Sequence, residues 1–178
     1  MKEINLHNKI FEVSISDTEI TQIVDNIAKK INATKVKDPI FIAIMNGAFL
    51  FAADIMRNIT IPNAEISFIK LSSYSGTKTT GEVSELIGFS KNIKNRNVII
   101  LEDIIDSGFT LEKIMSLLEK ENVATIKVAT LLFKPDAYLK DIKIDFIGKS
   151  IPNNFVVGYG LDYDEIGRNL PHIYKLKK

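Results

Sequence analysis

Two short stretches of this chain are apolar at every position, and each leads through a turn into a helical pattern. Residues 40–45 read Ile-Phe-Ile-Ala-Ile-Met, and residues 98–101 read Val-Ile-Ile-Leu. A strand of this kind is buried on both faces, which is typical of a parallel sheet covered by helices on either side. Residues 126–133 predict a third buried strand. The sequence therefore predicts an α/β fold with a central parallel sheet flanked by helices, and with ligands at the carboxyl ends of its strands.

The segments around these strands predict the remaining elements. Ser16 and Glu19 form a capping box at the start of a helix over residues 17–31, in which apolar residues recur at helical spacing. Residues 111–118 show the same spacing after the second apolar strand. The other expected elements are a helix over residues 48–57, a strand over 64–71, a long polar loop over 72–81 and a turn over 102–108.

The chain has the size and composition of one compact domain with a small appendage. It has 178 residues, of which 46% are hydrophobic and 25% are charged, and this is enough for a core of ordinary size. After Pro135 the pattern changes, because short apolar pieces alternate with Gly and Pro and show no helical periodicity. We expect a single domain over residues 1–178, with a core over about residues 16–140 and a small β-rich hood formed by residues 1–15 and 141–178.

Composition also excludes several classes of function. The chain has no cysteine, so a thiolate nucleophile, a disulfide framework and a cysteine-based zinc site are all excluded. Its 23 basic and 22 acidic residues give a net charge of +1, which is not the electrostatic footprint of a nucleic-acid-binding protein. No apolar run is long enough to span a membrane. We therefore expect a cytoplasmic protein that binds neither nucleic acid nor membrane.

Residues 98–110 combine a buried strand with three carboxylates and a glycine-containing turn. Glu102 and Asp103 follow the strand directly, and Asp106 comes three residues later. Ser107 and the glycine after it open a helix, and the N–H groups at a helix N-terminus are suited to a phosphate. One alternative is that Asp106 or Ser107 only caps this helix and that the paired acids are solvated turn residues. Acids beside an anion site instead favour a sugar phosphate with its hydroxyl groups and a magnesium ion.

This segment resembles the signature with which type I phosphoribosyltransferases bind phosphoribosyl pyrophosphate (PRPP). That signature is an apolar strand followed by Glu-Asp, two aliphatic residues, Asp, Ser or Thr, Gly, any residue and Thr, and every defined position is present. Other segments narrow the resemblance to the hypoxanthine or hypoxanthine-guanine phosphoribosyltransferases, from about Phe41 to the C-terminus. They are the pyrophosphate loop at residues 44–49, the start of the catalytic loop at 71–74, the base-binding segment at 143–152, and the C-terminal signature at 155–163 and 168–172.

The resemblance implies the type I phosphoribosyltransferase fold and an enzyme of purine salvage. Such an enzyme transfers the 5-phosphoribosyl group from PRPP to N9 of hypoxanthine, and also of guanine, and gives IMP or GMP and pyrophosphate with Mg²⁺ as cofactor. Its partners are PRPP and an oxopurine base, and a homodimer or homotetramer is expected. Two alternatives stay open. One is a transferase that prefers guanine or xanthine, and the other is a regulatory protein of the same fold that senses PRPP.

The resemblance also assigns roles within the PRPP signature. Glu102 and Asp103 would accept hydrogen bonds from the ribose hydroxyls and help to hold the metal. Asp106 would act as the general base that takes the purine ring proton near N7. The 5′-phosphate would be held by Ser107, Gly108, Phe109 and Thr110, and Phe109 can contribute only its backbone N–H.

The pyrophosphate and the shielding of the site involve other segments. The resemblance implies that Met45, Asn46, Gly47 and Arg168 bind pyrophosphate and that the Met45–Asn46 peptide bond is cis. Many relatives have Lys or Arg in place of Asn46. Ser73 and Tyr74 would belong to a catalytic lid that keeps water away from the reacting sugar.

The purine would be bound by residues nearer the C-terminus. The resemblance places Lys143 against the 6-oxo group of the base, stacks Phe155 on the ring and gives Val156 a backbone contact. Asp162 would contribute to the purine site and would also hold a pyrophosphate-bound Mg²⁺ through water. The glycine pair of Gly158-Tyr-Gly160 is not a dinucleotide fingerprint, because it lacks the third glycine and opens no helix.

Overall fold

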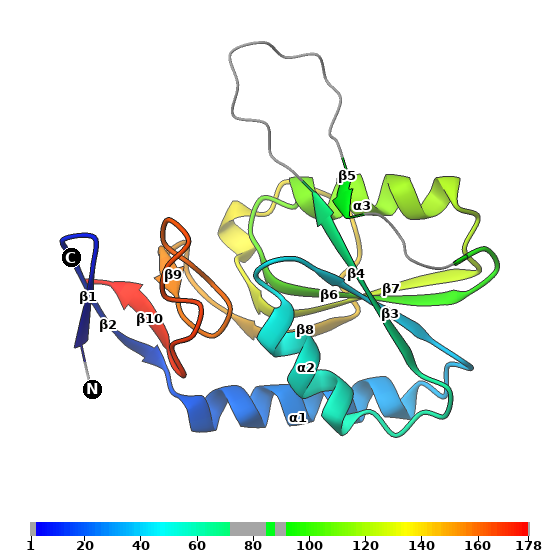
Figure 1. Cartoon of the computed structure of the whole chain (residues 1–178), viewed down its shortest axis with the longest axis horizontal. Helices are drawn as coiled ribbons and strands as arrows, with labels where there is room; N and C mark the ends of the chain where they lie inside the picture. Colours follow the sequence, from blue (N-terminus) through cyan, green and yellow to red (C-terminus); the bar gives the residue numbers. More distant parts are fainter. Residues whose placement is uncertain (1–2, 72–84, 88–91, 178) are drawn as a thin grey trace, which may run out of the picture.

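The computed structural model describes residues 3–71, 85–87 and 92–177. Within them a six-stranded sheet has the order β5-β4-β3-β6-β7-β8 (Figure 1). Its neighbouring strands are parallel except for β5, which runs antiparallel to β4. The strands are β3 (Ile40–Ile44), β4 (Glu65–Leu71), β5 (Glu85–Ile87), β6 (Asn97–Ile105), β7 (Thr125–Phe133) and β8 (Phe146–Ser150).

Helices cover both faces of this sheet. The helices α1 (Asp17–Ala33) and α2 (Phe49–Asn58) lie on one face, and α3 (Phe109–Lys120) lies on the other (Figure 1). Phe41 and Ala43 of β3 pack in the hydrophobic cluster that contains α1 and α2 residues, whereas Ile40, Ile42 and Ile44 pack in the cluster that contains α3 residues. Every residue of β3 is buried. The predicted α/β fold with a central parallel sheet is therefore confirmed.

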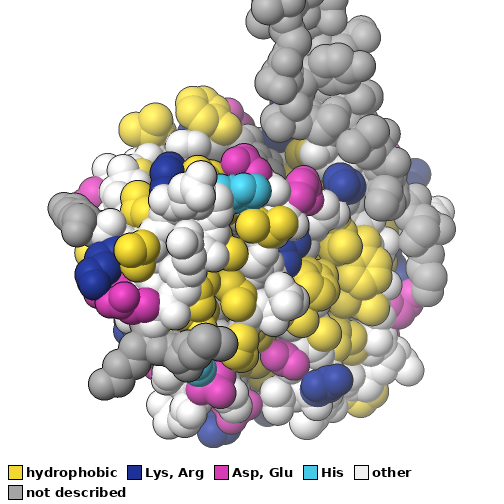
Figure 2. Space-filling model, turned by 60° about the vertical axis from the view of Figure 1, so that its left-hand side comes forward, with side chains coloured by type: hydrophobic (Ala, Val, Ile, Leu, Met, Phe, Trp, Pro, Cys, Tyr) yellow, Lys and Arg dark blue, Asp and Glu magenta, His cyan; other side chains and the backbone are white. Residues whose placement is uncertain are grey.

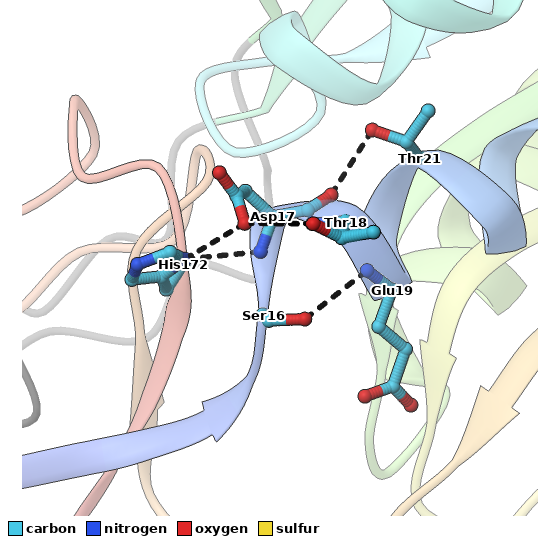
Figure 3. A network of polar contacts seen from close by, with 6 residues as sticks. All are labelled: Ser16, Asp17, Thr18, Glu19, Thr21 and His172. Carbon is cyan, nitrogen blue, oxygen red and sulfur yellow. Dashed lines mark hydrogen bonds and ion pairs between the residues drawn. The ribbon is translucent and has the colours of Figure 1, made fainter.

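The start of α1 is fixed by three polar contacts, of which Figure 3 shows those with Ser16 and His172. The Glu19 N–H donates to the Ser16 hydroxyl at 3.2 Å, which is the capping contact that the sequence predicts. The Glu19 carboxylate pairs with Lys149 of β8, so this side chain ties the helix to the sheet. The Asp17 N–H donates to Nδ1 of His172 at 2.9 Å, and this contact ties the helix to the C-terminal segment.

A second sheet forms a hood beside the first. Its antiparallel strands have the order β1-β2-β10-β9 and are β1 (Glu3–Leu6), β2 (Lys9–Ile15), β9 (Val156–Val157) and β10 (Ile173–Leu176). Phe11, Val157 and Tyr174 are buried in its core. The two ends of the described chain thus meet in one sheet (Figure 1).

Two expected boundaries are corrected. The segment 146–150, which we expected in the hood, is strand β8 and pairs in parallel with β7, so the central sheet extends to Ser150. The residues 102–105, which we expected in a turn, are the end of β6, where Ile105 pairs with Phe133 of β7. Within the described residues, no helix is long and apolar enough to cross a membrane.

Candidate active site

The carboxyl ends of β3 and β6 lie side by side at the centre of the sheet, and this position defines the candidate site. After β3 the chain continues into α2 on one face, whereas after β6 it continues into α3 on the other (Figure 1). Such a switch point leaves a crevice in which α/β proteins bind ligands. A pocket of about 470 Å³ opens here and is lined by Ile44, Met45, Gly47, Leu71, Glu102, Asp103, Ile104, Phe109, Thr110 and Lys113.

The predicted pyrophosphate loop packs directly on one of the predicted ribose acids. The Met45–Asn46 peptide bond is cis, as the resemblance implies. A Cβ atom added to Gly47 would lie 1.8 Å from Oδ2 of Asp103, so a larger residue would force the Asp103 carboxylate to move. The Asp103 carboxylate accepts a hydrogen bond from the N–H of Ile104 at 2.9 Å. Residues more than fifty positions apart in the sequence therefore form one surface.

The two acids at the end of β6 are held in an environment that disfavours their charge. Burial, and then the neighbouring Asp103, raise the pKa of Glu102 well above its ordinary value. The pKa of Asp103 is raised to about 6, chiefly by burial and also by the nearby Asp162, although backbone hydrogen bonds and Arg168 act to lower it. Among the described residues, Oε2 of Glu102 is buried without a hydrogen-bond partner. These oxygens are suited to a ligand that brings donors or positive charge.

The donor set fits Mg²⁺ that arrives together with a phosphate ligand. Mg²⁺ is usually bound by one or two carboxylates, with water and substrate phosphates completing its coordination. Glu102, Asp103 and Asp162 are the acids in electrostatic contact here. No group of three or more ligating side chains that could hold a metal by itself occurs among the residues described. A cation bound to these acids would take its other ligands from water and from substrate phosphates.

The turn after β6 has the features of a phosphate site. Gly108 is the N-cap of α3 with a φ of 85°, and no side chain caps this helix. Neither Asp106 nor Ser107 therefore serves as the cap, which was the alternative explanation of the motif. A hollow of about 80 Å³ lies over this turn and is lined by residues of segment 102–111. The uncapped N–H groups and the helix dipole favour an anion here.

A buried lysine that sequence reasoning missed lies next to the predicted general base. Nζ of Lys134 lies 2.7 Å from Oδ2 of Asp106, and only 7% of Lys134 is exposed. Lys143, which we expected at the base site, instead has a side chain that is 83% exposed and pairs with Asp145 at 3.2 Å. The structure thus brings Lys134, and not Lys143, to the site. Its position directly after the apolar strand 126–133 was the available signal.

The C-terminal signature completes the site from the hood side. Arg168 lies 2.9 Å from Asp162 and donates to the carbonyl oxygen of Gly160 at 2.9 Å. A Cβ atom added to Gly160 would lie 2.1 Å from the carbonyl oxygen of Gly47, so the two loops are in contact. Arg168 and Asp162 also influence the pKa of Asp103. The predicted pyrophosphate and metal residues thus come together from three distant segments.

The other predicted residues differ in their exposure. Phe155 is 44% exposed, and its ring centroid lies 5.3 Å from that of Tyr163. Val156 is buried in β9. Phe109 is 57% exposed, and the ammonium of Lys140 lies 4.2 Å from its ring centroid. Ser73 and Tyr74 lie outside the described residues, so their role as a lid stays a prediction.

Lys113 is a second cation that the sequence analysis did not single out. It lies on α3 and lines the larger pocket together with Glu102 and Asp103. Lys134 and Arg168 are each paired with an acid, whereas Lys113 has no ion-pair partner within the described part of the chain. It is therefore available to an anionic ligand.

Comparison with known proteins identifies the family of this chain. Residues 15–164 match the family model of the phosphoribosyl transferase domain, so the chain belongs to the phosphoribosyltransferase family. It is 39% identical to hypoxanthine-guanine phosphoribosyltransferases of Staphylococcus aureus strain Mu50 and Staphylococcus epidermidis strain RP62A, over 97% of this chain and 97% of each relative. Within the family, its relatives are thus hypoxanthine-guanine phosphoribosyltransferases.

Solved structures give the same result. A hypoxanthine-guanine phosphoribosyltransferase from Bacillus anthracis, with a HEPES molecule in its active site, has a TM-score of 0.86 at 38% identity and covers 93% of this chain and 98% of its own. A hypoxanthine phosphoribosyltransferase from Staphylococcus aureus has a TM-score of 0.87 at 38% identity, with 96% and 94% coverage. The fold expected from the resemblance is therefore confirmed.

Proposed function

We propose that this protein transfers the 5-phosphoribosyl group of PRPP to N9 of hypoxanthine, and also of guanine, and releases IMP or GMP and pyrophosphate in purine salvage. The observation that carries the proposal is the ion pair of Asp106 and Lys134 beside the uncapped start of α3. An oxopurine presents an acceptor at O6 and a ring N–H at N7 on one edge. Lys134 can donate to O6 while Asp106 accepts from the N–H.

This pair also explains why adenine should be refused. A 6-amino group presents N–H donors where an oxopurine presents an acceptor, so the ammonium of Lys134 would face another donor. A buried donor left without an acceptor costs about 1–3 kcal/mol, and more when it is charged. In this account Lys134 takes the role that the resemblance gave to Lys143. Asp106 keeps its expected role, because it can take the ring proton as the bond from N9 to the sugar forms.

The sugar phosphate fits the rest of the site. Its 5′-phosphate would occupy the turn formed by Ser107, Gly108, Phe109 and Thr110, and its ribose hydroxyls would donate to Glu102 and Asp103. The pyrophosphate would lie against the loop at residues 45–47, where Arg168 and Lys113 supply positive charge. The raised pKa values of the two acids support this placement, since hydroxyl donors and cations offset the cost of burying their charge.

Mg²⁺ would be held at the same place by Glu102, Asp103 and Asp162 together with oxygens of PRPP. When bound, it neutralises the pyrophosphate and stabilises the negative charge that develops as this group leaves. The residues of the chain have a separate task, which is to align the two substrates and to exclude water. Ser73 and Tyr74 would contribute by closing over the reacting sugar.

The cellular setting is inferred from the resemblance. We propose a homodimer or homotetramer that works in the cytoplasm. The exposed aromatic side chains Phe49 on α2 and Phe68 on β4 are compatible with contacts between subunits. Sedimentation equilibrium would measure the oligomeric state directly.

A panel of bases tests the proposed activity. Hypoxanthine, guanine, xanthine and adenine are each incubated with PRPP, Mg²⁺ and the protein, and nucleotide and pyrophosphate are measured together. We expect turnover of hypoxanthine and guanine and no turnover of adenine. Turnover of adenine at a comparable rate would contradict the assigned role of Lys134, and turnover confined to guanine or xanthine would favour the alternative specificity.

The regulatory alternative has less support. Acidic and basic side chains are interspersed on the face seen in Figure 2, and the whole chain has a net charge of only +1. A protein that binds nucleic acid usually gathers basic residues on one face. A filter-binding assay with RNA and DNA, in the presence and absence of PRPP, would detect such binding.

A further inference from the structure

The loop at residues 158–160 has an unusual backbone. Gly158, Tyr159 and Gly160 have φ values of 103°, 49° and 98°. Glycine adopts such values readily, whereas a tyrosine does so only when its surroundings impose them. Contacts of Tyr159 with its surroundings must therefore offset the strain of its backbone.

Both glycines are required by close contacts. A Cβ atom on Gly160 would lie 2.1 Å from the carbonyl oxygen of Gly47, and one on Gly158 would lie 2.1 Å from the carbonyl oxygen of His172. His172 is itself tied to α1, because its Nδ1 accepts a hydrogen bond from the N–H of Asp17 (Figure 3). The loop at residues 158–160 thus packs between the pyrophosphate loop and the segment around His172, which is hydrogen-bonded to α1.

The side chain of Tyr159 connects this loop to helix α2. It is 93% buried, since 7% of the residue is exposed, and its hydroxyl donates to Oδ2 of Asp54 at 2.7 Å. Burial, followed by the hydrogen bond to Asp54, raises the pKa of Tyr159, so the hydroxyl keeps the proton that it donates. Asp54 lies on α2, which begins at Phe49, two residues after Gly47. The hydrogen bond therefore joins the loop to the helix that carries the pyrophosphate loop.

We propose that Tyr159 is a positioning residue for pyrophosphate, and that its hydrogen bond to Asp54 keeps Gly160 seated on Gly47. The residues that depend on this seat are Arg168, which donates to the carbonyl oxygen of Gly160, and Asp162, which pairs with Arg168. The Tyr159–Asp54 hydrogen bond, which we call the latch, thus sets the distance between the pyrophosphate loop and the side chains of Arg168 and Asp162. This inference rests on the proposed function and adds a residue that touches no substrate.

The test compares two ligands that use different parts of the site. Binding of pyrophosphate with Mg²⁺ and binding of IMP are measured by titration calorimetry for the wild type and for Tyr159→Phe, which removes only the hydroxyl. We expect pyrophosphate to bind about tenfold more weakly, because Arg168 would be displaced and the loss of one hydrogen bond from a charged group to the ligand is worth about this much. IMP should bind within about twofold of the wild type, because its phosphate turn and the Asp106–Lys134 pair lie on the central sheet and α3.

Variants of the acceptor check that the hydrogen bond is responsible. Asp54→Ala should weaken pyrophosphate binding as Tyr159→Phe does, and the double variant should be no worse than either single one. Asp54→Asn keeps an acceptor and should recover most of the affinity. A double variant whose loss equals the sum of the two single losses would overturn the proposal.

A matched control separates positioning from stability. Tyr138→Phe removes a comparable hydroxyl, which donates to the carbonyl oxygen of Ile142 at 2.8 Å, and it should leave pyrophosphate affinity unchanged. Wild-type affinity in Tyr159→Phe, or an equal loss of pyrophosphate and IMP binding, would refute the positioning role. If the wild type itself bound no pyrophosphate and transferred no phosphoribosyl group, the proposed function would fail along with the latch.

Discussion

At the scale of single residues, the proposed base site depends on a charge pair that is present before any substrate arrives. Lys134 and Asp106 lie 2.7 Å apart, with 9% of the lysine side chain and 46% of the aspartate side chain exposed. The lysine is thus held by the protein, while the carboxylate still lines the hollow over the turn after β6. A base that enters this place meets one fixed donor and one accessible acceptor.

Substitutions of Lys134 and Lys143 test which of the two lysines binds the purine base. Lys134→Met removes a buried cation beside Asp106, and we expect the KM for hypoxanthine to rise at least about tenfold, since a hydrogen bond from a charged group is worth about 1.5–3 kcal/mol. Lys143→Met changes an exposed side chain and should alter this KM by less than about twofold. Steady-state kinetics with saturating PRPP measures both. The reverse ranking would restore the assignment made from sequence.

These residues also mark how far the sequence could predict the site. Glu102, Asp103 and Asp106 could be found because acids that follow an apolar strand and precede a Gly turn are rare. Lys134 was missed because a single lysine after a strand has the same pattern as a solvated surface residue. Its burial depends on the neighbouring strand β6, which the local sequence of Lys134 does not contain.

At the scale of elements, the end of β6 differs from the expected turn for a physical reason. The acids at 102 and 103 are poor strand formers, so the sequence favoured a turn there. The backbone nevertheless stays extended because β6 pairs with β7 as far as Ile105 and Phe133. The helices and buried strands, in contrast, were predicted well, since their apolar periodicity is a local property. Register between strands is set by tertiary contacts and could not be predicted.

A substitution at Gly47 tests the contact between the β3 and β6 loops. Gly47→Ala places a methyl group 1.8 Å from Oδ2 of Asp103, and we expect it to lower the free energy of unfolding by about 1–3 kcal/mol, as overpacking does. In an Asp103→Ala background the clash disappears, so the same change should cost much less. Urea denaturation of the four proteins measures this coupling. Equal costs in both backgrounds would show that the two residues are not in contact.

At the scale of the whole molecule, the boundary between the central sheet and the hood differs from the one predicted from the sequence. The segment 146–150 was expected in the hood because it is short and lacks helical neighbours. It belongs to the central sheet because β7 has a free edge that β8 can pair with. The hood itself joins both chain ends, and a contact between segments so far apart leaves no local pattern. The prediction that distant segments form one site therefore rested on the family resemblance alone.

The buried acids predict how stability changes with pH in the protein without metal or substrate. Asp103 has an ordinary pKa of 3.8 that rises to about 6 in the folded protein, and the pKa of Glu102 is also raised. Between these values the folded state binds more protons than the unfolded state, so the contribution of these acids to stability falls as pH rises from about 4 to 6 and beyond.

Denaturation at several pH values tests whether this contribution to stability falls as pH rises. The free energy of unfolding is measured in urea at pH 5, 6 and 7 in the presence of a chelator, for the wild type and for Asp103→Asn. The variant cannot ionise at this position, so its stability relative to the wild type should increase between pH 5 and pH 7. A difference that stays constant over this range would mean that Asp103 has no raised pKa.

The most direct test of the account is the conversion of hypoxanthine and PRPP to IMP and pyrophosphate by the wild type and by Asp106→Asn, with IMP binding measured in parallel. We expect the wild type to turn over and the variant to lose at least about 10²-fold in kcat, the usual contribution of a general base, while it still binds IMP. Wild-type protein that forms no IMP, or an Asp106→Asn variant with full activity, would contradict the account.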